Sequence, residues 1–271
     1  MTLASFDASA ARSAGVLLVG HGTRSALGKQ EFLTLAQEVA QRAGVPVEPG
    51  FLEMAEPTIA TATARLVDRG TRHIVVAPLL LFAAGHAKDD IPRAVASALG
   101  ALGATDVTSQ QAEHLGCHRA IVELSNRRFT ETLQVLHPLA SADTYLLLVG
   151  RGSRDESATA EMHEFARLRA QQSPVGGTSV AFLAMAQPRI QPTLQELGQR
   201  GWKRVVVQPH LLFHGDLHDT LSSAVESCRN EWPKTEWALA PYLAMGLAES
   251  RPVRDLLCAA IDERIRAALA A

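Results

Sequence analysis

One stretch of sequence that occurs twice decides the fold. Residues 15–24 read GVLLVGHGTR and residues 145–154 read YLLLVGRGSR, at an offset of 130 positions. Each copy is a short apolar run that ends at a glycine and continues into a polar loop. Such a run, bounded by glycine, is typical of a strand buried on both faces of a parallel sheet. The chain therefore carries the same strand and loop in both halves.

Two further repeats follow in the same order. Residues 51–59 (FLEMAEPTI) match residues 182–190 (FLAMAQPRI) at six of nine positions, and residues 69–82 (RGTRHIVVAPLLLF) match residues 200–213 (RGWKRVVVQPHLLF). Both pairs are offset by 131 positions. Three ordered matches with a nearly constant offset indicate an internal duplication.

The duplication predicts the domain organisation. We expect an N-terminal tail and two homologous domains, with the bounds 1–14, 15–140 and 141–271. Within each half, strand-like runs alternate with helically spaced apolar residues, which predict helices over 30–42, 118–136 and 254–270, among others. Alternating strands and helices imply parallel sheets with right-handed crossovers. The predicted fold class is α/β: two flavodoxin-like domains related by a pseudo-twofold axis, each a four-stranded parallel sheet of order 2-1-3-4 flanked by helices.

The composition indicates a globular protein without a nucleic-acid or membrane partner. Hydrophobic residues make up 47% of the chain and charged residues 20%, and the formal net charge of −2 comes with no cluster of Lys and Arg. The longest apolar runs have about 11 residues, below the ~20 that span a bilayer, and residues 1–14 lack a secretory signal. The three cysteines form no CxxC pair, which favours a reducing compartment. We expect a cytoplasmic protein.

Two histidines are candidates for a metal site. In open α/β sheets, ligands bind beyond the carboxyl ends of the strands where the strand order reverses. The loop after the first strand contains His21, the loop after the third contains His86, and the second strand ends near Glu53. Two neutral imidazoles with open coordination positions suit Fe²⁺, Co²⁺ or Ni²⁺, whereas a structural zinc site is closed by four ligands. The alternative is that both are surface-loop histidines.

Three motifs resemble those of a known family. GHGTR at residues 20–24, FLEMAEP at residues 51–57 and VVAPLLLFAAGHAKDDIP at residues 75–92 resemble the CbiX-type sirohydrochlorin chelatases of the class II chelatase superfamily. The resemblance extends over residues 15–245 and is to the long, tandem-domain members. It implies an enzyme, a metal chelatase of the lyase class, that inserts Fe²⁺ or Co²⁺ into sirohydrochlorin on the routes to siroheme or cobalamin.

The resemblance also assigns residues. It implies that His21 and His86 bind the metal, that Glu53 assists catalysis, and that the site faces the cleft between the two halves without an organic cofactor. Metal insertion removes two pyrrole N–H protons, and an imidazole or a carboxylate can accept a proton near pH 7.

Four basic residues are candidates for binding the carboxylates of the substrate. They are Arg24, Lys88, Arg151 and Arg154. A guanidinium group can pair with a carboxylate through two parallel hydrogen bonds, which also sets its orientation. The alternative for each residue is a solvated surface charge.

The second half departs from the first at the site positions. Arg151 occupies the position of His21, and a guanidinium group stays protonated and cannot bind a metal. Ala184 occupies the position of Glu53. We therefore expect the second half to have lost the ancestral metal site.

Three other histidines of the second half leave their role open. None of His210, His214 and His218 aligns with His86. His214 and His218 are four residues apart and would share one face if a helix includes both. They are candidates for a helper metal site, for substrate contacts or for surface histidines.

Two other functions stay open at this point. One is the insertion of Ni²⁺ into a related tetrapyrrole, and the other is a non-catalytic carrier of metal or tetrapyrrole. The sequence has neither a His-rich tail nor a CxxC extension of the kind seen in some cobalt-specific members of the family it resembles, so the resemblance favours iron over cobalt. Because the duplication supplies both halves in one chain, we expect a monomer.

Overall fold

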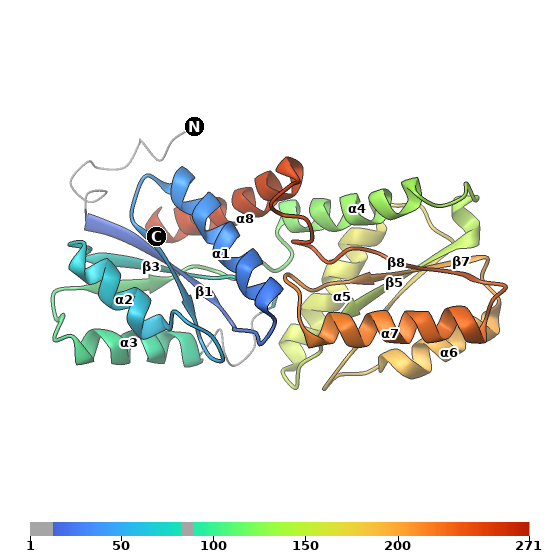
Figure 1. Cartoon of the computed structure of the whole chain (residues 1–271), viewed down its shortest axis with the longest axis horizontal. Helices are drawn as coiled ribbons and strands as arrows, with labels where there is room; N and C mark the ends of the chain where they lie inside the picture. The colour runs from blue at the N-terminus through green and yellow to red at the C-terminus, as the bar shows by residue number, and fades with distance from the viewer. Residues whose placement is uncertain (1–12, 83–88, 271) are drawn as a thin grey trace. The chain divides into compact units, whose positions relative to one another are not determined.

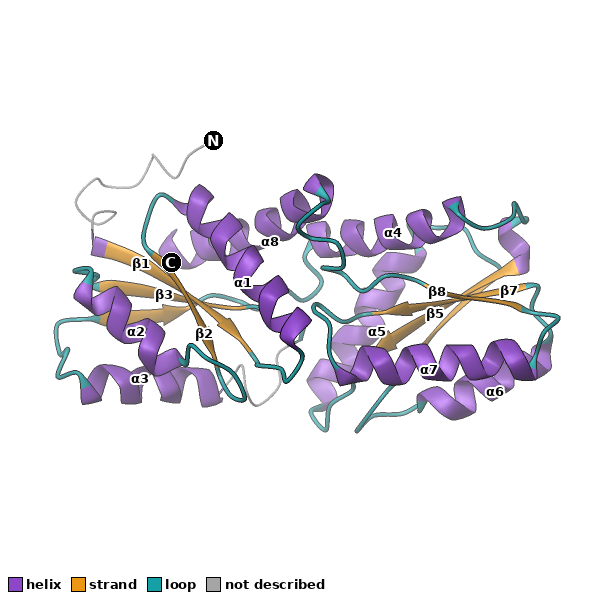
Figure 2. Ribbon diagram, viewed as in Figure 1, coloured by secondary structure: helices purple, strands orange, loops and turns teal. Residues whose placement is uncertain are grey.

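The computed structural model describes residues 13–82 and 89–270. Most of the expected tail, and the candidates His86 and Lys88, lie outside the described residues. The chain forms two four-stranded parallel sheets, with the strand orders β2-β1-β3-β4 and β6-β5-β7-β8 (Figures 1 and 2). The predicted pair of parallel sheets of order 2-1-3-4 is confirmed. No helix in the described part of the chain is long and apolar enough to cross a membrane.

The first sheet places β1 at its centre, between β2 and β3. Its strands are β1 (Ala14–Gly20), β2 (Val47–Phe51), β3 (His73–Pro78) and β4 (Thr108–Gln111), and the helices between them are α1 (Ala26–Ala43), α2 (Ile59–Asp68) and α3 (Ile91–Ala101). Every residue of β1 is buried, as expected for a strand covered on both faces. Helix α1 begins earlier than the expected residue 30 because the side chain of Ser25 accepts a hydrogen bond from Gly28 N at 3.1 Å.

The second sheet repeats this arrangement. Its strands are β5 (Thr144–Gly150), β6 (Gly177–Phe182), β7 (Arg204–Pro209) and β8 (Glu236–Leu239), and the helices between them are α5 (Glu156–Ala170), α6 (Ile190–Arg200) and α7 (Asp216–Glu231). Asp155 caps α5 by accepting a hydrogen bond from Ser157 N at 2.9 Å. The two halves therefore share helix-capping positions as well as strand order.

The last helix of each half packs on the sheet of the other half. Helix α4 (Arg119–Gln134) follows β4 but contacts α5, and helix α8 (Arg251–Ala270) follows β8 but contacts α1 and β3 (Figure 1). One compact unit is Met1–Leu115 with Gly246–Ala271, and the other is Gly116–Met245. The expected boundary near residue 140 separates the two sequence repeats, but it does not separate the two compact units.

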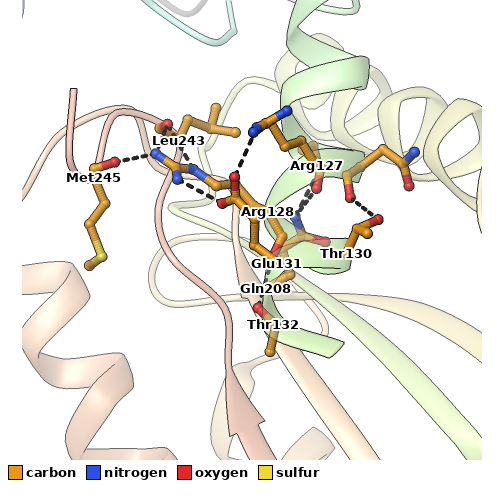
Figure 3. A network of polar contacts seen from close by, with 10 residues as sticks. Arg127, Arg128, Thr130, Glu131, Thr132, Gln208, Leu243 and Met245 are labelled. Carbon is orange, nitrogen blue, oxygen red and sulfur yellow. Dashed lines mark hydrogen bonds and ion pairs between the residues drawn. The ribbon is translucent and has the colours of Figure 1, made fainter. Parts of the chain in front are cut away.

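Buried polar contacts hold α4 against the rest of the second unit. The Arg128 side chain is 5% exposed, and its Nε and Nη2 donate to Leu243 O at 3.1 and 2.8 Å (Figure 3). Its Nη2 also donates to Met245 O, and its Nη1 donates to Glu131 Oε2 at 3.0 Å. Burial lowers the pKa of Arg128, but these acceptors compensate the buried charge. Gln208 Nε2 of β7 donates a hydrogen bond to the backbone carbonyl oxygen of Ser125 in α4 at 2.5 Å.

Helix α8 is held in the first unit by apolar packing and ion pairs. Leu257, Ile261 and Ile265 are at most 2% exposed. Arg42 Nη2 of α1 lies 2.8 Å from Asp255 Oδ1 of α8, and this hydrogen bond lowers the pKa of the Asp255 carboxyl. Helix α8 is therefore part of the core of the first unit, although it lies at the other end of the sequence.

Candidate functional site

The structure brings His21 and Glu53 together at the carboxyl ends of β1 and β2. His21 follows β1 directly, and Glu53 lies two residues after β2. His21 Nε2 is 3.2 Å from Glu53 Oε1. The His21 side chain is 21% exposed and that of Glu53 is 49% exposed. An imidazole and a carboxylate therefore face each other at an edge of the sheet that a ligand can reach.

Backbone hydrogen bonds hold the two loops together. Leu52 N donates to Gly20 O at 2.9 Å, and Glu53 N donates to His21 O at 3.1 Å. These bonds continue the pairing of β1 with β2 beyond the ends of both strands. Gly22 has a φ of +109°, and a Cβ at this position would lie 1.8 Å from Glu53 O. Only glycine fits this close approach, because a side chain would push the Glu53 loop away from His21.

The acidic residue closest to His21 is Glu53 rather than Glu56. Glu56 Oε2 accepts a hydrogen bond from Thr58 N at 2.9 Å, so Glu56 stabilises the turn before α2. Within this turn Met54 has a φ of +60°, in the left-handed region, and the residue is 52% exposed. A non-glycine residue with this backbone conformation and an exposed apolar side chain is unusual and points to a functional constraint.

The second half keeps the backbone of this site without its chemistry. Ala184 N donates to Arg151 O at 2.8 Å, as Glu53 N does to His21 O. Gly152 has a φ of +85°, and a Cβ there would lie 1.9 Å from Ala184 O. An exposed guanidinium group and a methyl group thus replace the imidazole and the carboxylate. Arg151 and Ala184 therefore offer no imidazole and no carboxylate at the positions of His21 and Glu53.

Comparison with known proteins agrees with the duplication. The family model CbiX matches this chain twice, over residues 15–132 and 145–264. The chain belongs to the CbiX family. The two matches confirm the predicted duplication and the predicted tandem form.

Relatives of known activity cover most of this CbiX-family chain. The sirohydrochlorin ferrochelatase of Priestia megaterium is 32% identical over 89% of this chain and 90% of its own length. The sirohydrochlorin cobaltochelatase of the same organism is 28% identical over 84% of this chain and 73% of its own length. The solved structure of SirB from Bacillus subtilis with Fe³⁺ has a TM-score of 0.79 at 26% identity, covering 93% of this chain and 96% of that one.

The basic candidates of this CbiX-family protein are exposed where they are described. Arg24, Arg151 and Arg154 lie in the loops that follow β1 and β5. Among the described residues, neither Arg24 nor Arg154 forms an ion pair with a carboxylate. Arg154 lines a shallow depression that also includes Met185 and Gln187. Both guanidinium groups belong to exposed residues.

His210 does not belong to an accessible site. It directly follows β7 and is 3% exposed, with its ring 4.0 Å from the ring of Phe165 between centroids. Burial lowers the pKa of His210 to about 3, so the ring is neutral and forms part of the core. Of the three second-half histidines whose role the sequence leaves open, only His214 and His218 remain candidates for binding.

Sequence reasoning did not single out a pair of exposed methionines at equivalent positions of the two halves. Met185 in the second half has a φ of +60° and an exposed fraction of 54%, much as Met54 has in the first half. The signal was present, because FLxMAxP occurs in both repeats. These methionines have no role in the sequence-based expectations, and their exposure to solvent is a finding of the structure.

Proposed function

We propose that this CbiX-family protein is a sirohydrochlorin chelatase that inserts Fe²⁺ or Co²⁺ into sirohydrochlorin. The observation that carries the proposal is the contact between His21 Nε2 and Glu53 Oε1 at 3.2 Å in an accessible loop pair. The relatives described above support the reaction, since they are named for iron and cobalt insertion into the same substrate. For this reason we propose iron or cobalt, rather than nickel, as the metal substrate.

The His21–Glu53 pair fits the binding of a divalent ion. An imidazole binds a metal only through a ring nitrogen that carries no proton. Metal–nitrogen and metal–oxygen bonds of about 2.1 Å place neighbouring ligands roughly 3 Å apart. The 3.2 Å between Nε2 and Oε1 matches that spacing, so both atoms can bind one ion. His86, outside the described residues, is the proposed second imidazole.

The same pair can handle protons. When no metal is bound, the carboxylate of Glu53 is placed to accept a hydrogen bond from a protonated Nε2. During insertion the macrocycle loses two N–H protons as the metal binds to its nitrogens. Glu53 is 49% exposed, so it can take a proton from the substrate and release it to water. We assign Glu53 the role of proton acceptor and His21 the role of metal ligand.

The substrate's own groups suggest further contacts. We propose that Arg24, Lys88, Arg151 and Arg154 bind its carboxylates. We also propose that the exposed thioether of Met54 packs on a face of the macrocycle, because methionine adapts to flat apolar surfaces. A raised KM for sirohydrochlorin in Met54→Ala would support the second contact, and an unchanged KM would refute it. Since one chain contains both repeats, we propose that the enzyme acts as a monomer.

Steady-state insertion under anaerobic conditions tests the proposal. Protein, sirohydrochlorin in excess and Fe²⁺ or Co²⁺ are mixed, and the absorbance of the macrocycle is followed. We expect many turnovers for the natural protein, and a loss of most activity in His21→Ala and Glu53→Gln with stability changed by about 0.5 kcal/mol or less. His73→Asn is the matched control, because His73 lies at the opposite end of the same sheet.

Two outcomes would contradict the proposal. A spectral change that stops at one equivalent of substrate per protein would identify a carrier rather than an enzyme. Near-normal turnover of His21→Ala at limiting metal would show that the metal is bound elsewhere.

A further inference from the structure

A second group of potential metal ligands lies beyond the carboxyl end of β7. His214 Nε2 is 3.2 Å from Asp219 Oδ1, and His218 Nδ1 is 3.7 Å from the same oxygen. One ligand atom from each of the three residues lies within 4.8 Å of the other two. The ligands of one first-row metal ion lie roughly 3–4.4 Å apart when each bond is about 2.1 Å. Small side-chain rotations are therefore enough to place all three on one ion.

The local backbone brings these side chains together. Helix α7 begins at Asp216, so His218 and Asp219 belong to its first turn while His214 precedes the helix. The condition under which both histidines would share a helix face is not met, because the helix does not include His214. Gly215 between them is fully extended, with a φ of 178°, and His214 Nε2 lies 3.2 Å from Asp219 Oδ1 in the first turn of α7.

Packing restrains the two imidazoles. The ring of Tyr242, which is 2% exposed, lies edge-on to both histidine rings, at 6.0 Å from His214 and 5.0 Å from His218 between centroids. The two histidine rings are 5.4 Å apart. Because the buried ring of Tyr242 restrains both imidazole rings, these side chains lose little conformational entropy when a ligand binds.

One nitrogen of this group has no hydrogen bond. His218 Nδ1 is shielded from solvent and has no hydrogen-bond partner, since 3.7 Å to Asp219 is too long for a hydrogen bond. A buried polar atom without a partner costs free energy. A cation bound to this nitrogen would remove that cost, whereas the His214–Asp219 contact alone does not.

We propose that His214, His218 and Asp219, none of which belongs to the His21–Glu53 pair, form a binding site for a divalent first-row transition metal. Two imidazoles and one carboxylate suit Fe²⁺, Co²⁺, Ni²⁺ or Zn²⁺. Three protein ligands leave coordination positions open, and Asp219 has a side chain that is 62% exposed, so a bound ion can exchange with solution. This inference does not depend on the proposed function, because it concerns metal binding without the tetrapyrrole.

The test is an anaerobic titration of the full chain with Co²⁺ alone, followed by calorimetry and by the visible absorption of bound cobalt. The variant His21→Ala/His86→Ala removes the proposed first-half ligands, so the remaining binding reports on the second half. We expect one Co²⁺ per chain in this variant. Adding His218→Gln is expected to weaken that binding by more than about tenfold, since even an outer partner of a ligand contributes that much.

The control is His137→Ala in the same background, because His137 is an exposed histidine of the same unit whose side chain is outside the cluster. It is expected to leave the binding unchanged. Thermal unfolding gives a second measurement that detects misfolding: Co²⁺ should raise the Tm of the His21→Ala/His86→Ala variant, and His218→Gln should abolish this rise without lowering the metal-free Tm by itself. Absence of Co²⁺ binding in the His21→Ala/His86→Ala variant, or unchanged binding after His218→Gln, would overturn the proposal.

Discussion

Replacing Gly22 with alanine tests whether the His21–Glu53 spacing controls activity. A Cβ at position 22 would lie 1.8 Å from Glu53 O, and the φ of +109° is unfavourable for any residue with a side chain. The clash is with backbone, so no side-chain rotation relieves it. An ordinary C···O contact is about 3.3 Å. The two loops must therefore separate by roughly 1.5 Å.

The Gly22→Ala substitution has one consequence for stability and one for activity. The backbone conformation alone costs on the order of 1–3 kcal/mol of stability. The separation also moves Glu53 Oε1 from 3.2 Å to beyond hydrogen-bonding distance of His21 Nε2. A misplacement of about 1 Å at a reacting group lowers the rate by around 100-fold. We therefore expect Gly22→Ala to lose about two orders of magnitude in kcat while the protein stays folded.

The repeat provides the matched control, Gly152→Ala. Its Cβ would meet Ala184 O at 1.9 Å with a φ of +85°, so its cost in stability should be similar. The loop in question carries no imidazole–carboxylate pair, and kcat should stay within a few-fold of the natural value. Urea unfolding and steady-state insertion are measured for both variants. If Gly22→Ala and Gly152→Ala lose kcat equally, or if neither does, the spacing argument is wrong.

Three further predictions follow from single features. Arg151→Ala should raise the KM for sirohydrochlorin more than it changes the apparent affinity for metal, with Arg151→Lys only a partial rescue; an unchanged KM would assign Arg151 a structural role. Leu257→Ala in α8 and Leu124→Ala in α4, both 0% exposed, should each cost about 2–5 kcal/mol. Hydrogen exchange should show that Leu257→Ala destabilises the unit that contains β1 and that Leu124→Ala destabilises the unit that contains β5. The reverse result would contradict the packing of α8 in the first unit and of α4 in the second. Arg42 lowers the pKa of Asp255, so the Arg42–Asp255 pair stabilises the fold above pH 3.8, and this stabilisation is lost as the pH falls through the lowered pKa. In Asp255→Asn the Tm should therefore fall less between pH 5 and pH 2 than in the natural protein. An acid transition that is unchanged in this variant would exclude a contribution from the pair.

Local patterns in the sequence were sufficient to predict the two sheets and to place His21 and Glu53 of the candidate site at the same edge of the first one. Strands such as β1 are continuous apolar runs that end at glycine, and this pattern depends only on near neighbours in the chain. The three ordered repeats then extend the assignment from one half to the other. The order of parallel strands brings the loops after β1 and β2 to the same edge, which is why His21 and Glu53 could be expected near each other.

The tertiary structure alone decided which sheet each final helix covers. Helices α4 and α8 each bury apolar residues at helical spacing, so periodicity predicts both helices but not the unit in which each one packs. Contacts between residues far apart in sequence make the choice, including Arg128 with Leu243 and Arg42 with Asp255. The same holds for His214 and His218: α7 begins after His214, yet the two histidine rings lie 5.4 Å apart between centroids. Sequence periodicity reports how one element is buried, whereas the choice of partner depends on the free energy of packing the whole chain.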